Sequence, residues 1–206
     1  MKKQIVVIHG GDTFNTYEEY LSFLKNREFD LERLKKEDWK ETLSEKLGEK
    51  FEVIILKMPN SANAKYLEWK IWFEKLIPFL KDEVILVGHS LGGIFLAKYL
   101  SENSFPKRIR ATLLVAPPYD TEGTDYSLVD FTLSEAPGKL TEQSDEIFLY
   151  HSEDDPVVPF GSLRKYEKEL SGARVRIFKD RGHFQQEKFP ELVEDIKSLK
   201  DSRLSP

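Results

Sequence analysis

The sequence predicts an α/β domain in which a mainly parallel sheet carries helices on both faces. Three observations lead to this fold class: short apolar segments recur, helix-like segments separate them, and no repeat or linker divides the 206 residues. Segments that are apolar throughout are typical of parallel strands covered on both faces. Strands that alternate with helices are typical of a doubly wound fold. We therefore expect a single domain over residues 1–206.

Six segments rich in Val, Ile and Leu are the predicted strands. They span 5–9, 53–56, 84–88, 112–116, 147–151 and 175–178. Apolar residues at helical spacing lie between them, at Trp39, Leu43 and Leu47, then at Leu67, Ile71 and Leu76, then at Ile94, Phe95, Tyr99 and Leu100. The long connection 11–50 is expected to hold two helices, and 117–145 is rich in turn formers. Ligands of such folds bind beyond the carboxyl ends of the strands, so we expect the catalytic residues in the loops that follow the strands.

Composition argues against several classes of function. The net charge of −5, without a basic stripe, argues against nucleic-acid binding. No segment approaches the roughly 20 apolar residues that cross a bilayer. The chain has no cysteine, which excludes disulfides, thiolate metal sites and a cysteine nucleophile. The first residues lead into a short strand without a secretory signal, so we expect a cytoplasmic protein.

A Gly-x-Ser-x-Gly motif is centred on Ser90. It follows the predicted strand 84–88 and precedes the predicted helix that begins at Gly93. This order of strand, tight turn and helix presents the nucleophile in α/β-hydrolases, and we expect Gly88 and Gly92 to relieve crowding around it. A glycine-rich turn with a capping serine is the alternative. The motif predicts a nucleophile at Ser90 in a single-domain α/β-hydrolase fold, with strand order 2-1-3-4-5-6.

The chain has four histidines, and their positions favour one of them as the base. His183 lies on the loop between the last predicted strand and the final helix, where an imidazole reaches a serine hydroxyl. We expect His9 to shape the turn that supplies an oxyanion amide. His89 is expected to point away from the nucleophile, and His151 to pack at the end of the fifth strand. A histidine without a catalytic role is the alternative reading of His183.

The acid is expected between the nucleophile and the base, because α/β-hydrolases use the order Ser, Asp or Glu, His. The loop after the fifth strand offers three consecutive carboxylates, Glu153, Asp154 and Asp155. Adjacent side chains point in different directions, so one of them holds the imidazole. We favour Asp155, because Pro156 stiffens the loop that presents it. Asp154 is the main rival, and a solvated acidic turn is the alternative without a catalytic role.

The oxyanion hole needs two backbone amides. One is expected at Leu91, directly after the nucleophile, and the other at Gly11 in the loop after the first strand, with Asp12 as the alternative. A small pocket is expected, and six aromatic residues are candidates for its lining, although aromatics at such spacing are more often core. They are Tyr119, Tyr126, Phe131, Trp69, Trp72 and Phe73.

These residues predict acyl transfer through a covalent intermediate on Ser90, with His183 as base and Asp155 as its partner. No His-Glu-x-x-His or similar motif predicts a metal site, and no cofactor is expected. A binding protein that keeps this fold without turnover is the rival from another class. Thioesterase and acyltransferase chemistry use the same residues as esterase chemistry.

Four segments together resemble the family of retinoblastoma-binding protein nine and YdeN-like serine hydrolases. They are 88–93 (GHSLGG), 152–156 (SEDDP), 182–185 (GHFQ) and 57–60 (KMPN). The resemblance spans nearly the whole chain, and the last two segments are more specific than the first. It implies a compact α/β-hydrolase without a large lid or cofactor, and the aspartate before the proline, Asp155, as the triad acid. Simple esters and aminoacyl-type compounds are the small-molecule substrates that it implies.

The chain departs from this family in two ways. The vertebrate member was named for binding the retinoblastoma protein, an interaction associated with a Leu-x-Cys-x-Glu motif. This chain lacks cysteine, so that partner is not expected. The charged connection 11–50 also looks longer than the family's usual first crossover. We expect it to add a helix near the mouth of the pocket and to alter what enters.

Overall fold

The fold is an α/β-hydrolase fold built on one six-stranded parallel sheet, as seen in a computed structural model that describes residues 2–134 and 136–199. The strands are β1 (Lys3–Ile8), β2 (Phe51–Leu56), β3 (Val84–His89), β4 (Ile109–Val115), β5 (Ile147–Ser152) and β6 (Arg174–Phe178). Their order is β2-β1-β3-β4-β5-β6, and each neighbouring pair is parallel. The predicted fold class, strand positions and strand order are confirmed.

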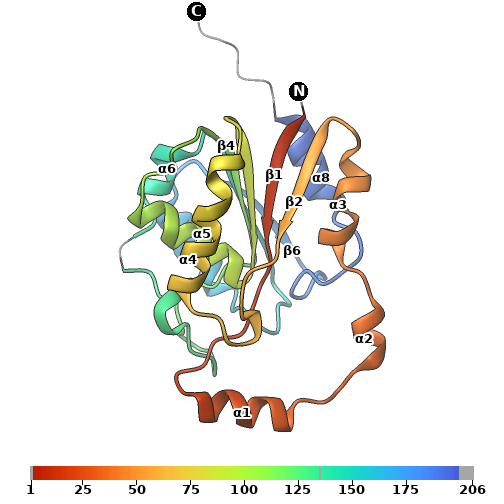
Figure 1. The fold of residues 1–206 in the computed structure, drawn as a ribbon, viewed down its shortest axis with the longest axis vertical. Coiled ribbons are helices and arrows are strands. Elements are labelled where there is room, and N and C mark those ends of the chain that lie inside the picture. The colour runs from red at the N-terminus through yellow and green to blue at the C-terminus, as the bar shows by residue number, and fades with distance from the viewer. Residues whose placement is uncertain (1, 135, 200–206) are drawn as a thin grey trace, which may run out of the picture.

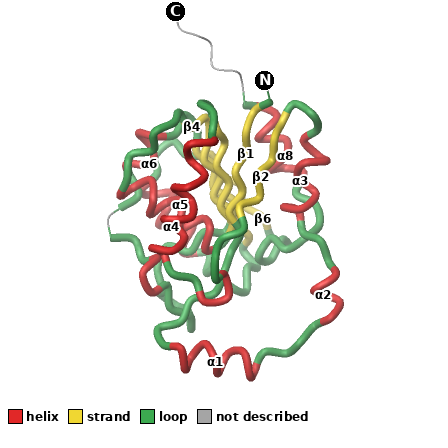
Figure 2. The backbone as a smooth tube through the Cα atoms, in the orientation of Figure 1, coloured by secondary structure: helices red, strands yellow, loops and turns green. Residues whose placement is uncertain are grey.

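Helices cover both faces of this sheet. The longer connecting helices are α3 (Trp39–Leu47), α4 (Tyr66–Leu76), α5 (Leu91–Glu102), α7 (Gly161–Glu169) and α8 (Pro190–Ser198), with α6 (Lys139–Gln143) shorter. Single 3-10 turns occur at Ser61–Asn63, Ile77–Phe79 and Val129–Phe131. Figures 1 and 2 show α4 and α5 on one face of the sheet and α3 and α8 on the other. None of the described helices is long and apolar enough to cross a membrane.

Alternate residues of the central strands pack into two separate cores. Val6 and Leu86 face the core under α4, α5 and α7, whereas Val7 and Val87 face the core under α3 and α8. All four side chains are fully buried. Burial on both faces explains why the strands read as continuous apolar segments rather than as alternating ones.

Two of the three residues expected to face the core from helix α4 face solvent, and the third, Leu76, packs against the core. Leu67 and Ile71 are 63% and 49% exposed, whereas Trp69 and Phe73 are fully buried. Both sets recur at helical spacing, so periodicity alone does not choose between them. The aromatic face packs against the core because its burial removes more apolar area from water.

The first connection holds three helices rather than the expected two. In addition to α3 it contains α1 (Tyr17–Asn26) and α2 (Leu31–Lys35), and we call residues 12–38 the strap. The strap runs beyond the carboxyl ends of the strands and away from the sheet (Figure 1). No residue of α1 is buried, and Phe14 packs against Phe23 with ring centroids 5.0 Å apart. The expected additional helix near the catalytic end of the sheet is therefore present.

Candidate active site

Ser90 occupies a strained turn between β3 and α5. Its backbone φ is 55° and its ψ is −122°, a conformation that is costly for a residue with a side chain and is maintained only by surrounding structure. A Cβ atom at Gly88 would lie 2.4 Å from the carbonyl oxygen of Gly92, and one at Gly92 would lie 2.4 Å from that of Ile8. The two glycines thus allow strand, helix and β1 to approach one another. The crowding they relieve is with backbone rather than with the serine itself.

The structure brings together the three side chains expected to form the triad. Ser90 Oγ lies 2.8 Å from His183 Nε2, and His183 Nδ1 lies 2.8 Å from Asp155 Oδ2 and 3.1 Å from Oδ1. In the tautomer these partners require, Nδ1 donates to the carboxylate and Nε2 accepts from the hydroxyl. The serine hydroxyl is therefore positioned to lose its proton to the imidazole.

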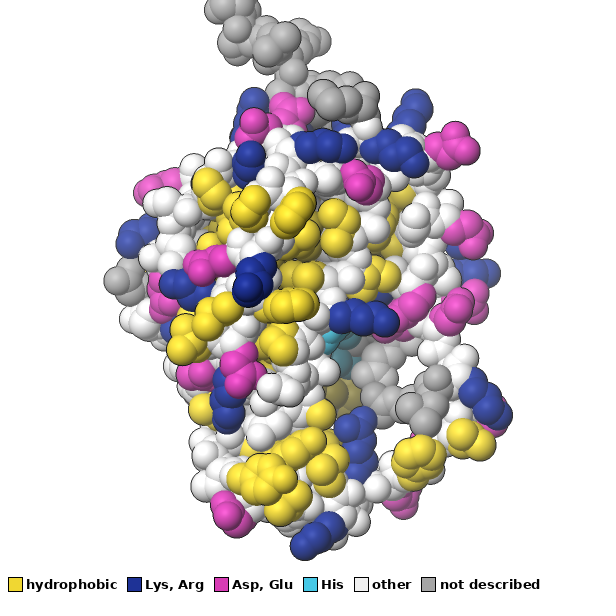
Figure 3. Space-filling view, viewed as in Figure 1, with side chains coloured by type: hydrophobic (Ala, Val, Ile, Leu, Met, Phe, Trp, Pro, Cys, Tyr) yellow, Lys and Arg dark blue, Asp and Glu magenta, His cyan; other side chains and the backbone are white. Residues whose placement is uncertain are grey.

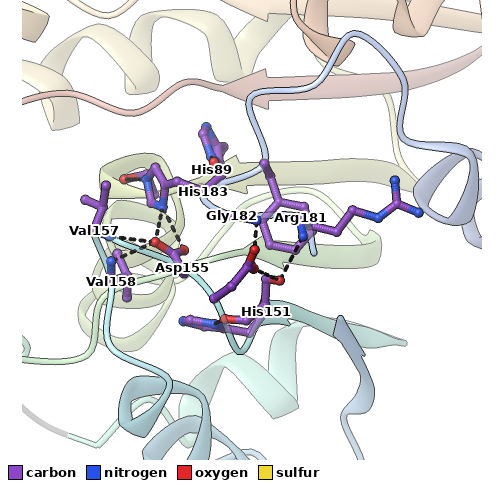
Figure 4. Close-up of polar contacts among 12 residues, drawn as sticks. His89, His151, Asp155, Val157, Val158, Arg181, Gly182 and His183 are labelled. Atoms are coloured by element: carbon purple, nitrogen blue, oxygen red, sulfur yellow. Dashed lines mark hydrogen bonds and ion pairs between the residues drawn. The ribbon is translucent and has the colours of Figure 1, made fainter. Parts of the chain in front are cut away.

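The carboxylate of Asp155 is buried and accepts hydrogen bonds from two backbone amides as well as from His183. Its side chain is 0% exposed, and Oδ1 accepts from the backbone amides of Val157 and Val158 at 2.8 and 3.0 Å. Figure 4 shows these two bonds converging with the one from His183 on a single carboxylate. The two amide donors fix the orientation of the carboxylate. This carboxylate is thus placed to stabilise an imidazolium.

Asp154 is adjacent to Asp155 in sequence but binds other partners. Its Oδ1 accepts from the backbone amide of Gly182 at 2.9 Å and from the hydroxyl of Ser152. The Ser152 hydroxyl, and after it the Gly182 amide, hold the pKa of Asp154 below its usual value. The two rival carboxylates therefore bind different parts of the loop that carries His183.

The loop after β1 approaches the nucleophile turn: a Cβ atom at Gly10 would lie 3.0 Å from Ser90 Cβ, and Gly11 lines the same cavity as Ser90. Among the described residues, neither the Gly11 nor the Leu91 amide has a backbone acceptor. The Asp12 amide, the alternative to Gly11, already donates to the carbonyl oxygen of Ser61 at 2.8 Å. A free amide is what an oxyanion hole requires, so this geometry favours Gly11 over Asp12.

His9 holds the loop that carries Gly11. Its Nε2 accepts from the backbone amide of Met58 at 2.9 Å, so Nδ1 carries the proton and donates to Gly10 O at 2.6 Å. Burial lowers the pKa of His9 and keeps the ring neutral, as the bond from Met58 requires. The segment around Met58 therefore anchors the turn next to the nucleophile, through the bond from its backbone amide to His9.

The remaining two histidines differ in their placement: His89 lines the cavity that contains Ser90, whereas His151 lines neither of the two cavities at the site. His89 Nε2 donates to the backbone carbonyl oxygen of His183 at 2.9 Å, and its Nδ1 lies 3.5 Å from Lys40 Nζ. Burial, followed by the charge of Lys40, lowers the pKa of His89 well below the usual value. His151 is fully buried and packs edge-on against Phe160. His151 packs at the end of β5 as expected, and the ring of His89 is bonded to the backbone of His183 rather than to Ser90.

Two adjoining cavities open at the site. One of about 920 Å³ contains Ser90 and His183, and one of about 850 Å³ contains Leu91 and Asp155. Strap residues line both, and Phe23 belongs to each. Figure 3 shows an opening between the strap and the body of the molecule, with histidine surface at its edge. These volumes lie in the upper part of the usual range for ligand sites, roughly 300–1,000 Å³, so the small pocket expected from the sequence is not found.

Of the aromatic candidates for the pocket lining, Tyr126 alone lines one of these cavities. Phe131, Trp69 and Phe73 are fully buried in the core. Tyr119 packs against Tyr166, and Trp72 is 46% exposed on α4. Part of the lining of both cavities comes from the charged strap, for which the sequence contains no recognisable motif.

This fold and this arrangement of side chains define an α/β-hydrolase. The pattern of the serine hydrolase family matches residues 30–199, and the chain belongs to that family, whose members are hydrolases. Serine hydrolase RBBP9 of Rattus norvegicus is 26% identical over 157 residues, covering 72% of this chain and 78% of the relative. The putative hydrolase YdeN of Bacillus subtilis (strain 168) is 24% identical over 185 residues, covering 89% and 87%. The resemblance predicted from the sequence is confirmed.

Similarity extends to a solved structure. The crystal structure of the ydeN gene product from B. subtilis superposes with a TM-score of 0.71 at 20% sequence identity. The match covers 96% of this chain and 98% of that one. At this identity the similarity establishes the α/β-hydrolase fold.

Proposed function

We propose that this hydrolase cleaves ester- or aminoacyl-type substrates through an acyl-enzyme on Ser90, with a Ser90–His183–Asp155 triad. The observation that carries the proposal is the continuous hydrogen-bond chain from Ser90 Oγ through the imidazole to the buried carboxylate. A serine hydroxyl is a weak nucleophile at its free pKa and needs an adjacent base held by a third group. The three side chains provide this arrangement.

In the proposed cycle, Ser90 Oγ attacks the substrate carbonyl carbon while its proton passes to His183 Nε2. The amides of Leu91 and Gly11 donate to the oxyanion of the tetrahedral intermediate, and Asp155 stabilises the imidazolium. The imidazolium then gives its proton to the leaving group, and the acyl-enzyme remains. Water, deprotonated by His183, attacks the ester carbonyl, and collapse returns the proton to Ser90 Oγ and releases the acid.

The larger cavity offers charged partners to the polar part of a substrate. Arg27, Lys36 and Lys40 line the larger cavity together with acidic residues of the strap. The adjoining cavity differs, because Leu91, Pro118 and Leu128 are among its lining residues and offer apolar surface to an acyl group. We therefore expect cleavage of substrates that combine a polar part with an apolar acyl group.

The test is labelling with a fluorophosphonate probe, which modifies activated serines. We expect labelling of the wild type, none in Ser90→Ala and a sharp decrease in His183→Ala. Ser127→Ala is the control, because Ser127 lies on the wall of the neighbouring cavity, outside the hydrogen-bond chain. Absence of labelling in a folded wild type would contradict the triad and favour a binding protein without turnover. Rates on ester, thioester and aminoacyl series would then define the acyl class.

A further inference from the structure

The loop that carries His183 is tied to the loop that carries Asp155 by bonds outside the triad. We propose that Asp154 and Ser152 form a clamp that positions the imidazole of His183 between Ser90 and Asp155. Asp154 is thus a positioning residue, acting through the backbone. The inference rests on the proposed function, because it assigns these two side chains a task for the same base.

The clamp is a short network of three hydrogen bonds. The hydroxyl of Ser152 donates to Asp154 Oδ1 and accepts from the backbone amide of Arg181 at 3.0 Å. Asp154 Oδ1 also accepts from the amide of Gly182 at 2.9 Å. The bonds that reach Arg181 and Gly182 are drawn in Figure 4, beside the Asp155–His183 pair. The two amides immediately before His183 are therefore both held by Ser152 and Asp154.

The loop that carries His183, residues 179–185, depends on these two amides for its conformation, and we call it the base loop. Gly182 and Phe184, which flank His183, have φ values of 50° and 51°. This left-handed conformation is unfavourable for Phe184 and persists only when other contacts maintain it. The turn is closed by a bond from the Phe184 amide to Arg181 O at 3.0 Å. Release of the amides at 181 and 182 would free this turn and, with it, the direction of the imidazole.

The neighbouring carboxylate cannot replace Asp154. Asp155 is already engaged by His183 and by the amides of Val157 and Val158. On the carbonyl side, His89 holds His183 O. The backbone of the base is thus held at two points. His89 binds the carbonyl oxygen of His183, and the clamp binds the amides of the two residues that precede it. A charged acceptor forms stronger bonds to amides than a neutral one, which suits an aspartate at this position.

The proposal predicts a loss of rate rather than of substrate affinity. A misplacement of about 1 Å at a catalytic group can cost about 100-fold in rate. We expect Asp154→Ala to lower kcat about 10- to 100-fold with little change in KM. Asp154→Asn should stay within a few fold of the wild type, because its amide oxygen still accepts from Gly182. A kcat close to that of the wild type in Asp154→Asn would show that Asp154 acts by accepting a hydrogen bond and not by its negative charge.

The experiment compares the wild type, Asp154→Ala and Asp154→Asn, with Asp180→Asn as matched control. Asp180 is on the same loop and its side chain is 87% exposed. Two readouts are measured: steady-state kinetics on one ester, and the low-field proton NMR signal of His183 Nδ1–H. We expect the signal to weaken or shift in Asp154→Ala, and to persist in Asp154→Asn and in the control.

Ser152→Ala provides a second variant if Asp154→Ala does not fold. It retains the Asp154–Gly182 bond and loses the one from Arg181, so we expect a smaller decrease in kcat. Because the two side chains act as one unit, the double variant should lose less than the product of the two single losses. Thermal unfolding of each variant identifies those whose loss arises from unfolding.

The outcomes distinguish this role from the proposed function. A wild type that cleaves no substrate, combined with the expected change of the His183 signal, would contradict the function and support the clamp. Wild-type kcat and an unchanged signal in Asp154→Ala would overturn the clamp. So would equal losses in Asp154→Ala and Asp154→Asn, or a loss confined to KM.

Discussion

His89 donates a hydrogen bond to the backbone carbonyl oxygen of His183 at 2.9 Å, which connects the residue before the nucleophile to its proposed base. Trp39 at the start of α3 holds the same loop one residue further on, because its indole Nε1 donates to Phe184 O at 2.9 Å. The first residue of α3 and the last residue of β3 thus both support the loop that carries His183. Each of these donors makes the position of the imidazole depend on a distant segment.

We expect Trp39→Phe to lower stability by about 1–3 kcal/mol, because it leaves the buried carbonyl of Phe184 without a donor. Activity should decrease as well. Trp72→Phe is the matched control, since its indole also donates to a backbone carbonyl but the side chain is 46% exposed. Urea denaturation of both variants measures the difference. Equal stability of the two variants would show that the Trp39 bond does not support the loop.

Asp155→Asn is expected to lower kcat by about 10⁴-fold, as loss of the correct imidazole tautomer does in other serine triads. The asparagine still fits the buried site, so the fold should persist. Glu153→Gln, at an exposed carboxylate in the same loop, is the control and should retain full activity. Steady-state kinetics on an ester measure both. A decrease below tenfold in Asp155→Asn would exclude this carboxylate as the partner of His183.

Gly11→Ala should reduce kcat by about 100- to 1,000-fold, the usual cost of one lost oxyanion donor. A Cβ atom at this position would lie 2.6 Å from Ser61 O, so the loop must move and take the amide with it. Gly161→Ala is the control, because a Cβ atom there meets nothing within 4 Å. The rates of ester cleavage and of phosphonate labelling both measure the effect. Wild-type rates in Gly11→Ala would place the second oxyanion donor elsewhere.

Stability should decrease on mild acidification. Burial lowers the pKa of His9, His89 and His151, so below their unfolded pKa of about 6.5 the unfolded chain binds protons that the folded chain does not. Each histidine contributes a slope of up to about 1.4 kcal/mol per pH unit there, and full stability returns above about pH 7.5.

Urea denaturation at pH 7.5, 6.5 and 5.5 measures this dependence. His151→Gln removes one of these three imidazoles, so its free energy of unfolding should depend less steeply on pH than that of the wild type. Stability that stays constant or increases toward pH 5.5 would contradict the assignment of these rings as neutral in the folded chain.

Some parts of this fold and site are readable from the sequence because their cause is local. The turn at Ser90 needs small residues at 88 and 92, and β3 reads as continuous apolar sequence because both its faces are buried. The clamp and the Trp39 bond are not readable, because their partners are backbone amides and carbonyls, which any residue supplies. The expected face of α4 was wrong for another reason, since two sets of apolar residues share one spacing and packing chooses between them.

The central claim is that Ser90 forms a covalent acyl-enzyme. Intact-protein mass spectrometry after rapid acid quenching of an activated ester reaction tests it most directly. We predict that the wild type gains the mass of one acyl group, located by proteolysis on the peptide that contains Ser90, and that Ser90→Ala gains none. Turnover of the ester without an acylated species, or acylation that persists in Ser90→Ala, would contradict the account.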